Sequence, residues 1–328
     1  MAHGAEAGGQ IAPALGAVLA TGAIYVVGWR ELSRRMPQRF GPGRLAAFLG
    51  GLGAIVLAVA SPLDALAGQL LQAHMTQHML LMMVAPPLLW LGAPIAPMLR
   101  GLPRRIRRGV AAGLAAPPMR RIASGIAHPG VGWMAFAIAF WVWHTPRLYE
   151  LALRSDAWHH VEHACLFTTA MLFWRPVILA WPARSWWPRW TVIPYLLLAD
   201  LQNTVLAAIL TLSDRVIYPA YLTVPRTGTI TALEDQSVAG VIMWVPGSLV
   251  FLVAAVGVVM ETLGARGQAA LQGRLVESEG LVGTQSGPRC TPAFLANAPF
   301  RGSCRESAGP INRTMGPRWA CCPRCGAR

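Results

Sequence analysis

Long stretches without any charged residue dominate this 328-residue chain. No Asp, Glu, Lys or Arg occurs between Glu6 and Arg30, Arg44 and Asp64, Asp64 and Arg100, Arg121 and Arg147, or Asp235 and Glu261. A helix needs about 20 predominantly apolar residues to cross the hydrocarbon core of a bilayer, and each of these stretches can hold one. Because 54% of the residues are hydrophobic and only 13% are charged, the composition argues against a single soluble domain.

Seven apolar runs predict an all-α polytopic membrane protein, built as a bundle of seven transmembrane helices. The runs cover residues 11–29, 45–61, 70–97, 126–144, 158–180, 190–212 and 237–260. The fifth and sixth are the least hydrophobic because they carry Glu162 and Asp200. We therefore expect a transmembrane domain over residues 1–264. Residues 265–328 are rich in Gly, Pro, Ser and Arg and lack helical periodicity, which indicates a disordered cytoplasmic tail.

The distribution of arginine predicts the orientation of these helices. The formal net charge is +14, from 28 Arg and 14 acidic residues, with no Lys. Loops after the first, third and fifth runs contain fifteen Arg and one acidic residue, whereas the alternate loops contain four Arg and seven acidic residues. Basic residues near span ends accumulate on the cytoplasmic side, so we expect the N-terminus outside and the C-terminus in the cytoplasm. Because the arginines cluster between apolar runs instead of alternating with aromatic residues, we expect no nucleic-acid partner.

Five of the eight histidines fall where predicted helices meet the outer face. His74 and His78 begin the third run, His144 ends the fourth, and His159 and His163 begin the fifth. A spacing of four puts each pair on a single helix face, so two pairs at one depth can converge on a common ion. Polar groups in or near a membrane are commonly functional, and hydrogen bonding between helices is the alternative role.

The methionines beside the first histidine pair bear on which metal is expected. Imidazole suits copper, zinc and haem iron, whereas thioether sulfur favours Cu(I). Met75 and Met79 directly follow His74 and His78 in the sequence, which favours copper. Packing within an apolar helix is the alternative explanation of these methionines.

Four carboxylates are candidates to support the site. Asp200, in the middle of the sixth run, opposes insertion by roughly 2.5 to 3.5 kcal/mol unless it is paired or protonated, so we expect it to face the bundle interior. There it can orient a histidine, relay a proton or bond another helix. Asp64 and Asp235 lie at the outer face, where they can cap helices or line the mouth of the site. Glu162 lies near one end of the fifth run, among its histidines.

Several motifs occur in an order typical of one family. They are Ser61–Asp64, His74–Leu81, Pro86–Pro94, Trp143–Glu150, His159–His163, Phe173–Pro176, Asp235–Gly240 and Met243–Gly247. Over about residues 11–264 the chain resembles the CtaG family, the multispan bacterial assembly factors associated with caa-type cytochrome c oxidases. The resemblance implies a seven-helix protein of the bacterial plasma membrane that is needed to form an active terminal oxidase, at a copper-related step.

These features together predict an outward-facing copper site formed by the five histidines, with Met75 or Met79 as a further ligand and the carboxylates in support. Copper would pass to an oxidase subunit by ligand exchange, so we expect oxidase subunits as partners. The apolar runs make the lipid bilayer a second partner, and a homo-oligomer is compatible with the pattern. No nucleophile elbow, HExxH motif or phosphate loop occurs, so we expect an assembly factor rather than an enzyme. The alternatives are a haem-binding redox protein, whose facing histidines ligate iron axially, and a copper transporter.

Overall fold

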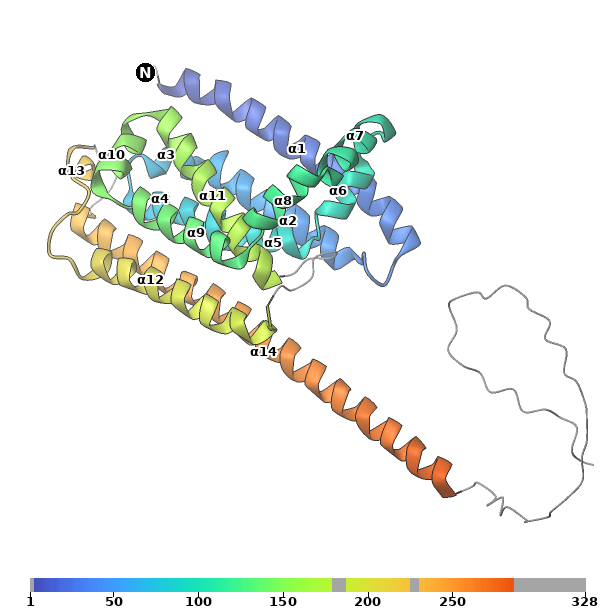
Figure 1. Cartoon of the computed structure of the whole chain (residues 1–328). Helices are drawn as coiled ribbons and strands as arrows, with labels where there is room; N and C mark the ends of the chain where they lie inside the picture. The colour runs from blue at the N-terminus through green and yellow to red at the C-terminus, as the bar shows by residue number, and fades with distance from the viewer. Residues whose placement is uncertain (1–2, 179–186, 225–229, 286–328) are drawn as a thin grey trace, which may run out of the picture. The chain divides into compact units, whose positions relative to one another are not determined.

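The computed structural model describes residues 3–178, 187–224 and 230–285, and every regular element within these ranges is helical (Figure 1). This agrees with the predicted all-α class. The longer helices are α1 (His3–Arg35), α2 (Pro42–Val59), α9 (Pro129–Trp143), α11 (Asp156–Ile178), α12 (Val192–Leu212) and α14 (Ala232–Gln285). The shorter ones are α3 (Pro62–Ala67), α4 (Leu71–Met79), the π-helix η1 (Leu80–Val84), α5 (Ala85–Leu91), α6 (Ile95–Gly101), α7 (Arg104–Ala115), α8 (Pro117–Ile126), α10 (Pro146–Arg154), the 3-10 helix η2 (Arg189–Thr191) and α13 (Ala220–Thr223).

Within the described residues, four helices are long and apolar enough to cross a membrane, and the number rises to six if each of two bent pairs forms one span. The four are Ala12–Arg35, Pro42–Val59, Arg189–Leu212 and Ala232–Gly264. The bent pairs are Leu71–Leu91 with Ile95–Gly101 and Pro117–Ile126 with Pro129–Trp143. These segments overlap six of the seven predicted runs. The remaining run, 158–180, corresponds to α11, whose 23 residues include histidines and charged side chains that lower its hydropathy.

The predicted third run, residues 70–97, is not one straight helix. Its axis turns by 69° at the break between Leu91 and Ile95. Ala93 adopts a positive φ of 48°, which a right-handed helix does not contain, and Pro94 disfavours helical geometry for the residue before it. The straight part of this run therefore ends at Leu91. Within it, η1 forms a π-helix, a single wider turn between α4 and α5.

Helix α11 packs against α5, η1, α9 and α10. Its aromatic residues Phe173 and Trp174 are at most 1% exposed and belong to the main hydrophobic core. The indole of Trp174 donates a hydrogen bond to the carbonyl of Met82 in η1 at 2.9 Å, and the indole of Trp90 in α5 donates to the carbonyl of Met171 at 2.8 Å. These two bonds fix the height of α11 relative to the α4–α5 segment.

Helices α1 and α6 approach each other closely at two glycines. A Cβ atom at Gly28 would lie 1.8 Å from the carbonyl oxygen of Pro97, and one at Gly101 would lie 1.9 Å from the carbonyl oxygen of Ile24. Neither position can carry a larger side chain unless the two backbones separate. Small residues that allow such close approach are typical of helix packing in membranes.

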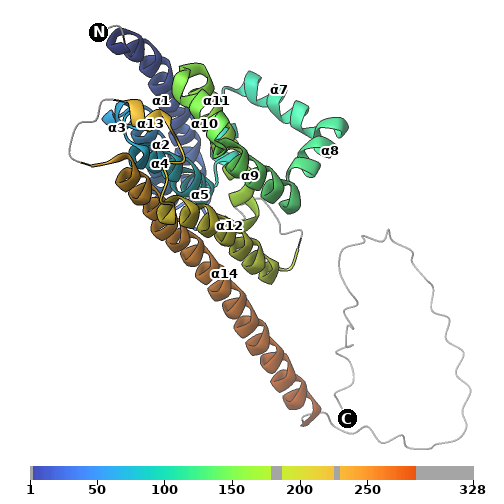
Figure 2. The same cartoon turned by 90° about the vertical axis from the view of Figure 1, so that its left-hand side faces the viewer.

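Helix α14 continues past residue 264, the expected end of the membrane domain, to Gln285. Its N-terminal part lies beside α12 (Figures 1 and 2), where the side-chain amide of Asn203 donates a hydrogen bond to the carbonyl of Met243 at 3.0 Å. The chain divides into a compact unit, Met1–Gln272, and a second unit, Gly273–Arg328. Most of the predicted disordered tail, residues 286–328, lies outside the described residues.

Candidate metal centre

Two histidines of α4 meet at the tips of their side chains. His74 and His78 are both buried, about one helical turn apart, and their Nε2 atoms lie 2.9 Å from each other. The N-terminus of α4 is held by α14, because the Asp235 carboxylate accepts hydrogen bonds from the backbone amides of Leu71 at 2.8 Å and Gln72 at 3.1 Å. This contact positions the histidine pair from a helix that is distant in the sequence.

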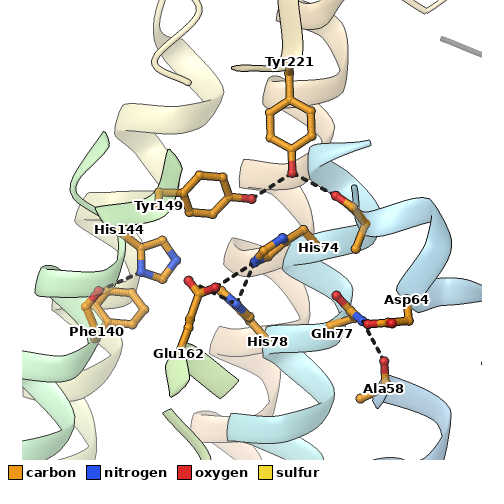
Figure 3. Close-up of polar contacts among 11 residues, drawn as sticks. Ala58, Asp64, His74, Gln77, His78, Phe140, His144, Tyr149, Glu162 and Tyr221 are labelled. Carbon is orange, nitrogen blue, oxygen red and sulfur yellow. Dashed lines mark hydrogen bonds and ion pairs between the residues drawn. The ribbon is translucent and has the colours of Figure 1, made fainter. Parts of the chain in front are cut away.

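Helix α11 adds a carboxylate and a third imidazole to this pair. Glu162 is fully buried, and its oxygens lie 3.5 Å from the Nε2 atom of His74 and 3.6 Å from that of His78 (Figure 3). One ligand atom from each of His74, His78, Glu162 and His163 lies within 4.8 Å of the others. A transition metal at about 2 Å from each ligand needs ligand atoms roughly 3 to 4 Å apart, so small side-chain movements suffice to hold an ion.

The other two predicted histidines lie next to this group. The ring centroid of His144, at the end of α9, is 5.7 Å from that of His78. The ring centroid of His159 is 5.1 Å from that of His74 and 4.1 Å from that of His163. The structure therefore brings all five histidines together. His160, which is exposed, hydrogen-bonds through its ring to the carbonyl of Asp156 in its own helix.

Most polar atoms of the cluster lack a hydrogen-bond partner within the described residues. His144 is informative, because its Nδ1 lies 2.7 Å from the carbonyl oxygen of Phe140. A carbonyl only accepts, so Nδ1 carries the proton and Nε2 keeps a free lone pair, the form in which imidazole binds a metal. Buried polar groups are hydrogen-bonded in roughly 90% of cases, so unpartnered atoms in one place fit a bound ion. The unpartnered atoms are His74 Nδ1, His78 Nδ1, His144 Nε2, His159 Nε2, His163 Nε2 and both carboxylate oxygens of Glu162.

Tyrosines from α10 and α13 cover one side of the cluster (Figure 3). The ring centroid of Tyr149 is 4.8 Å from that of His74, and the hydroxyls of Tyr149 and Tyr221 are 3.0 Å apart. Tyr221 donates to the carbonyl of Ala67 at 3.0 Å, so in this pair Tyr149 is the donor to Tyr221. Burial raises the pKa of both hydroxyls above the ordinary value of 10, so they stay protonated at neutral pH.

The predicted sulfur ligands, Met75 and Met79, pack within or against the main hydrophobic core. Met75 is fully buried there. The terminal methyl group of Met79 points toward α14, 3.5 Å from where a Cβ atom on Gly247 would stand. The four residues whose ligand atoms lie close together contribute imidazole nitrogens and a carboxylate oxygen. Ligation by the sulfur atoms of Met75 and Met79 therefore stays a prediction.

The remaining carboxylates connect helices. Asp64 accepts a hydrogen bond from the Gln77 side-chain amide at 2.8 Å, and the same amide group donates to the carbonyl of Ala58 at 2.7 Å. Asp200 accepts a hydrogen bond from the Ser248 hydroxyl of α14 at 2.7 Å. Of the roles expected for Asp200, the structure shows the contact between helices.

The sequence pattern predicts Glu162 only as a supporting carboxylate, whereas the structure places one of its oxygens in the group of four close ligand atoms. The signal was its spacing, because Glu162 follows His159 by three residues and therefore shares a helix face with it. Tyr149 and Gln77 were not anticipated. Tyr149 lies within the motif Trp143–Glu150, and Gln77 directly precedes His78.

The sequence model of a protein family described as cytochrome c oxidase caa3 assembly factor matches residues 23–264. The chain belongs to this family. The match confirms the CtaG resemblance. All five clustered histidines and Glu162 lie inside the matched segment, together with the helices that carry them.

Mycobacterial proteins show similarity over most of the chain. The uncharacterized protein Mb0105 of Mycobacterium bovis is 27% identical over 249 residues, which cover 70% of this chain and 35% of the relative. The uncharacterized protein ML1998 of Mycobacterium leprae is 25% identical over 240 residues, which cover 68% of this chain and 34% of the relative. The chain thus spans about a third of the length of these curated relatives. No solved structure matches it.

Proposed function

We propose that this assembly factor holds a copper ion at His74, His78, Glu162 and His163 and passes it to a cytochrome c oxidase subunit. The observation that carries the proposal is the group of four buried ligand atoms within 4.8 Å of one another. The caa3 assembly-factor family favours assembly over catalysis as the task of the protein. The family description does not include the bound metal or its transfer, and these are the parts that we propose.

Copper is favoured by the chemistry of the ligands and by the family. Three imidazoles and one carboxylate suit Cu(II) and Zn(II), and at a given nitrogen and oxygen site Cu(II) binds more tightly than Zn(II). The family resemblance implies a copper-related step in oxidase formation. Cu(I) would gain from a thioether ligand, so the oxidation state of the bound ion reports whether Met75 or Met79 takes part.

His144 and His159 supply a route for ligand exchange. Each has an unpartnered Nε2 atom beside the four-ligand group, so the ion can exchange one imidazole for another without losing all its ligands. His159 is half-buried, whereas the other four histidines are buried. We therefore assign the exit of the ion to the His159 side of the cluster.

We propose in addition that α11 is the seventh span of a bacterial plasma-membrane protein whose N-terminus lies outside. Between Glu162 and Ile178 the only exposed residues of α11 are Ala164 and Thr168, because this part packs against α5, α9 and α10, so it can cross the membrane with lower hydropathy. Fusions of a phosphatase that is active only outside the cytoplasm test this: a fusion after Ser155 should be active and one after Pro188 inactive. Equal activity of the two fusions would overturn the seventh span.

Copper stoichiometry tests the metal site. The purified, copper-loaded protein should retain copper, whereas the variant His74→Ala/His78→Ala should lose it. His160→Ala is the matched control, because His160 lies on α11 but is exposed and bonded to its own helix. Equal copper in the double variant and the unmodified protein would refute the site. Melting temperatures, measured in the same detergent, separate lost ligands from lost folding.

The cluster fits a haem less well than a single ion. The imidazole rings of neighbouring helices contact one another at centroid distances of 5.1 to 6.0 Å, so a macrocycle would have to separate them. A Soret band in the purified protein would favour haem over copper. Copper uptake into sealed vesicles that contain the protein would instead favour a transporter.

A further inference from the structure

Helices α7 and α8 stand apart from the metal cluster and contain no buried residue. α7 packs against α8, and α8 against α9 (Figure 2). They are 12 and 10 residues long, and helices this short are marginal in water without packing partners. Their surroundings must therefore supply the contacts that keep them helical.

Each of the two helices has an apolar face. In α7 the apolar residues follow a spacing of four, and in α8 spacings of three and four, which place each set on one side of its helix. Every one of these side chains is between 38% and 57% exposed. They are Ile106, Val110 and Leu114 in α7 and Met119, Ile122 and Ile126 in α8.

The remaining surface of α7 and α8 is strongly basic. No acidic residue occurs between Asp64 and Glu150. None of the six arginines of the two helices forms an ion pair within the described residues. At about 100° per residue, Arg104 and Arg108 lie opposite the apolar face of α7. The six are Arg104, Arg105, Arg107, Arg108, Arg120 and Arg121.

We propose that α7 and α8 lie in the membrane interface and bind anionic phospholipid headgroups. The apolar faces then contact acyl chains, and the arginines contact headgroup phosphates, with which guanidinium groups form paired hydrogen bonds. A bilayer with anionic lipid presents an apolar layer and a negative layer side by side, as these helices require. The location agrees, because the axis of the bent pair α8–α9 turns by 59°, so α8 does not continue in the direction of the apolar helix α9.

The test compares phosphatidylglycerol with phosphatidylcholine bound to the full chain. Protein purified from a mixture of the two lipids is examined by native mass spectrometry for the ratio of lipid adducts. The variant Arg104→Gln/Arg105→Gln/Arg107→Gln/Arg108→Gln should lose the preference for phosphatidylglycerol, by about five-fold for each arginine that contacts the anionic surface. The matched control is Arg30→Gln/Arg34→Gln/Arg35→Gln/Arg39→Gln, which removes the same charge from the C-terminal end of α1 and the turn that follows it.

Amide hydrogen exchange of residues 104–126 in nanodiscs supplies a second measurement. Exchange in the unmodified protein should slow when phosphatidylglycerol replaces phosphatidylcholine, and this effect should disappear in the α7 variant. Equal lipid preference in the α7 variant and the unmodified protein, or an equal loss in the control, would overturn the proposal. Protection that appears only on addition of oxidase subunits would also overturn it, in favour of a protein partner. Copper content should stay unchanged in the α7 variant, which keeps this test separate from that of the metal site.

Discussion

The carboxylate of Asp235, near the start of α14, accepts a hydrogen bond from the backbone amide of Leu71, the first residue of α4, at 2.8 Å. Because Asp235 also accepts from Gln72 and is fully buried, it serves as the cap that α4 does not take from its own flanking residue Leu70. The orientation of His74 and His78 thus depends on a residue of another helix.

Asp235→Asn should destabilise the protein and loosen the metal site together. The amide side chain can replace one acceptor oxygen but presents an N–H group to the second backbone amide, and a lost hydrogen bond to a charged group destabilises by about 1.5 to 3 kcal/mol. We expect a lower melting temperature and weaker copper retention. Asp214→Asn is the control, because Asp214 is exposed, and an equal effect of the two substitutions would contradict the capping role.

Glu162→Gln tests whether the buried carboxylate is a ligand. The substitution keeps the size of the side chain but removes its charge, so copper affinity should fall by at least about tenfold, the scale at which even outer-shell changes act. Competition with a copper chelator measures this. Glu150→Gln, which removes a carboxylate paired with Arg154 on α10, should leave affinity unchanged. Unchanged affinity in Glu162→Gln would remove this residue from the site.

Two substitutions at Tyr149 separate its ring from its hydroxyl. Tyr149→Phe keeps the ring beside His74 and removes one hydrogen bond to Tyr221, so it should lower stability by about 0.5 to 1.5 kcal/mol and leave copper retention intact. Tyr149→Ala removes the ring and should speed extraction of copper by a chelator. Equal extraction rates in the two variants would show that the ring does not cover the site.

Gly28→Ala should destabilise the α1–α6 contact. The added Cβ would stand 1.8 Å from the Pro97 carbonyl oxygen, and overpacking of this kind costs about 1 to 3 kcal/mol. Gly16→Ala is the matched control in the same helix, because no atom lies within 4 Å of its Cβ position. The control should be neutral or stabilising by up to about 1 kcal/mol, since alanine favours helix over glycine. Thermal unfolding in detergent measures both.

The helical class and the common helix face within each histidine pair could be predicted from the sequence, and for one physical reason. Apolar runs of span length predict helices, and a spacing of four residues fixes which side chains share a face. His74 and His78, and His159 and His163, follow directly from that period. Whether the two faces point toward each other depends on packing between helices, which the sequence pattern alone does not determine.

Other features depended on local backbone geometry or on contacts between distant segments, neither of which a hydropathy pattern contains. The turn at Ala93 depends on the local conflict with Pro94, which a window of average hydropathy does not detect. The direction of the Met79 side chain depends on the space left by Gly247 in α14. The sequence predicts that Asp235 caps a helix or lines the mouth of the site, and only the contact of α14 with α4 selects which helix it caps.

The π-helix η1 lies between α4, which carries His74 and His78, and α5, which contacts α11 through Trp90. A π-turn holds one residue more than an α-turn, so deletion of one residue within Leu80–Val84 would convert it to an α-turn while α4 and α5 keep the faces that they present to α11. The extra residue is thus absorbed locally, and the histidines of α4 and the Trp90 contact of α5 with α11 stay in register with each other. A one-residue deletion in a regular α-turn of the same segment would instead rotate one part against the other by about 100°.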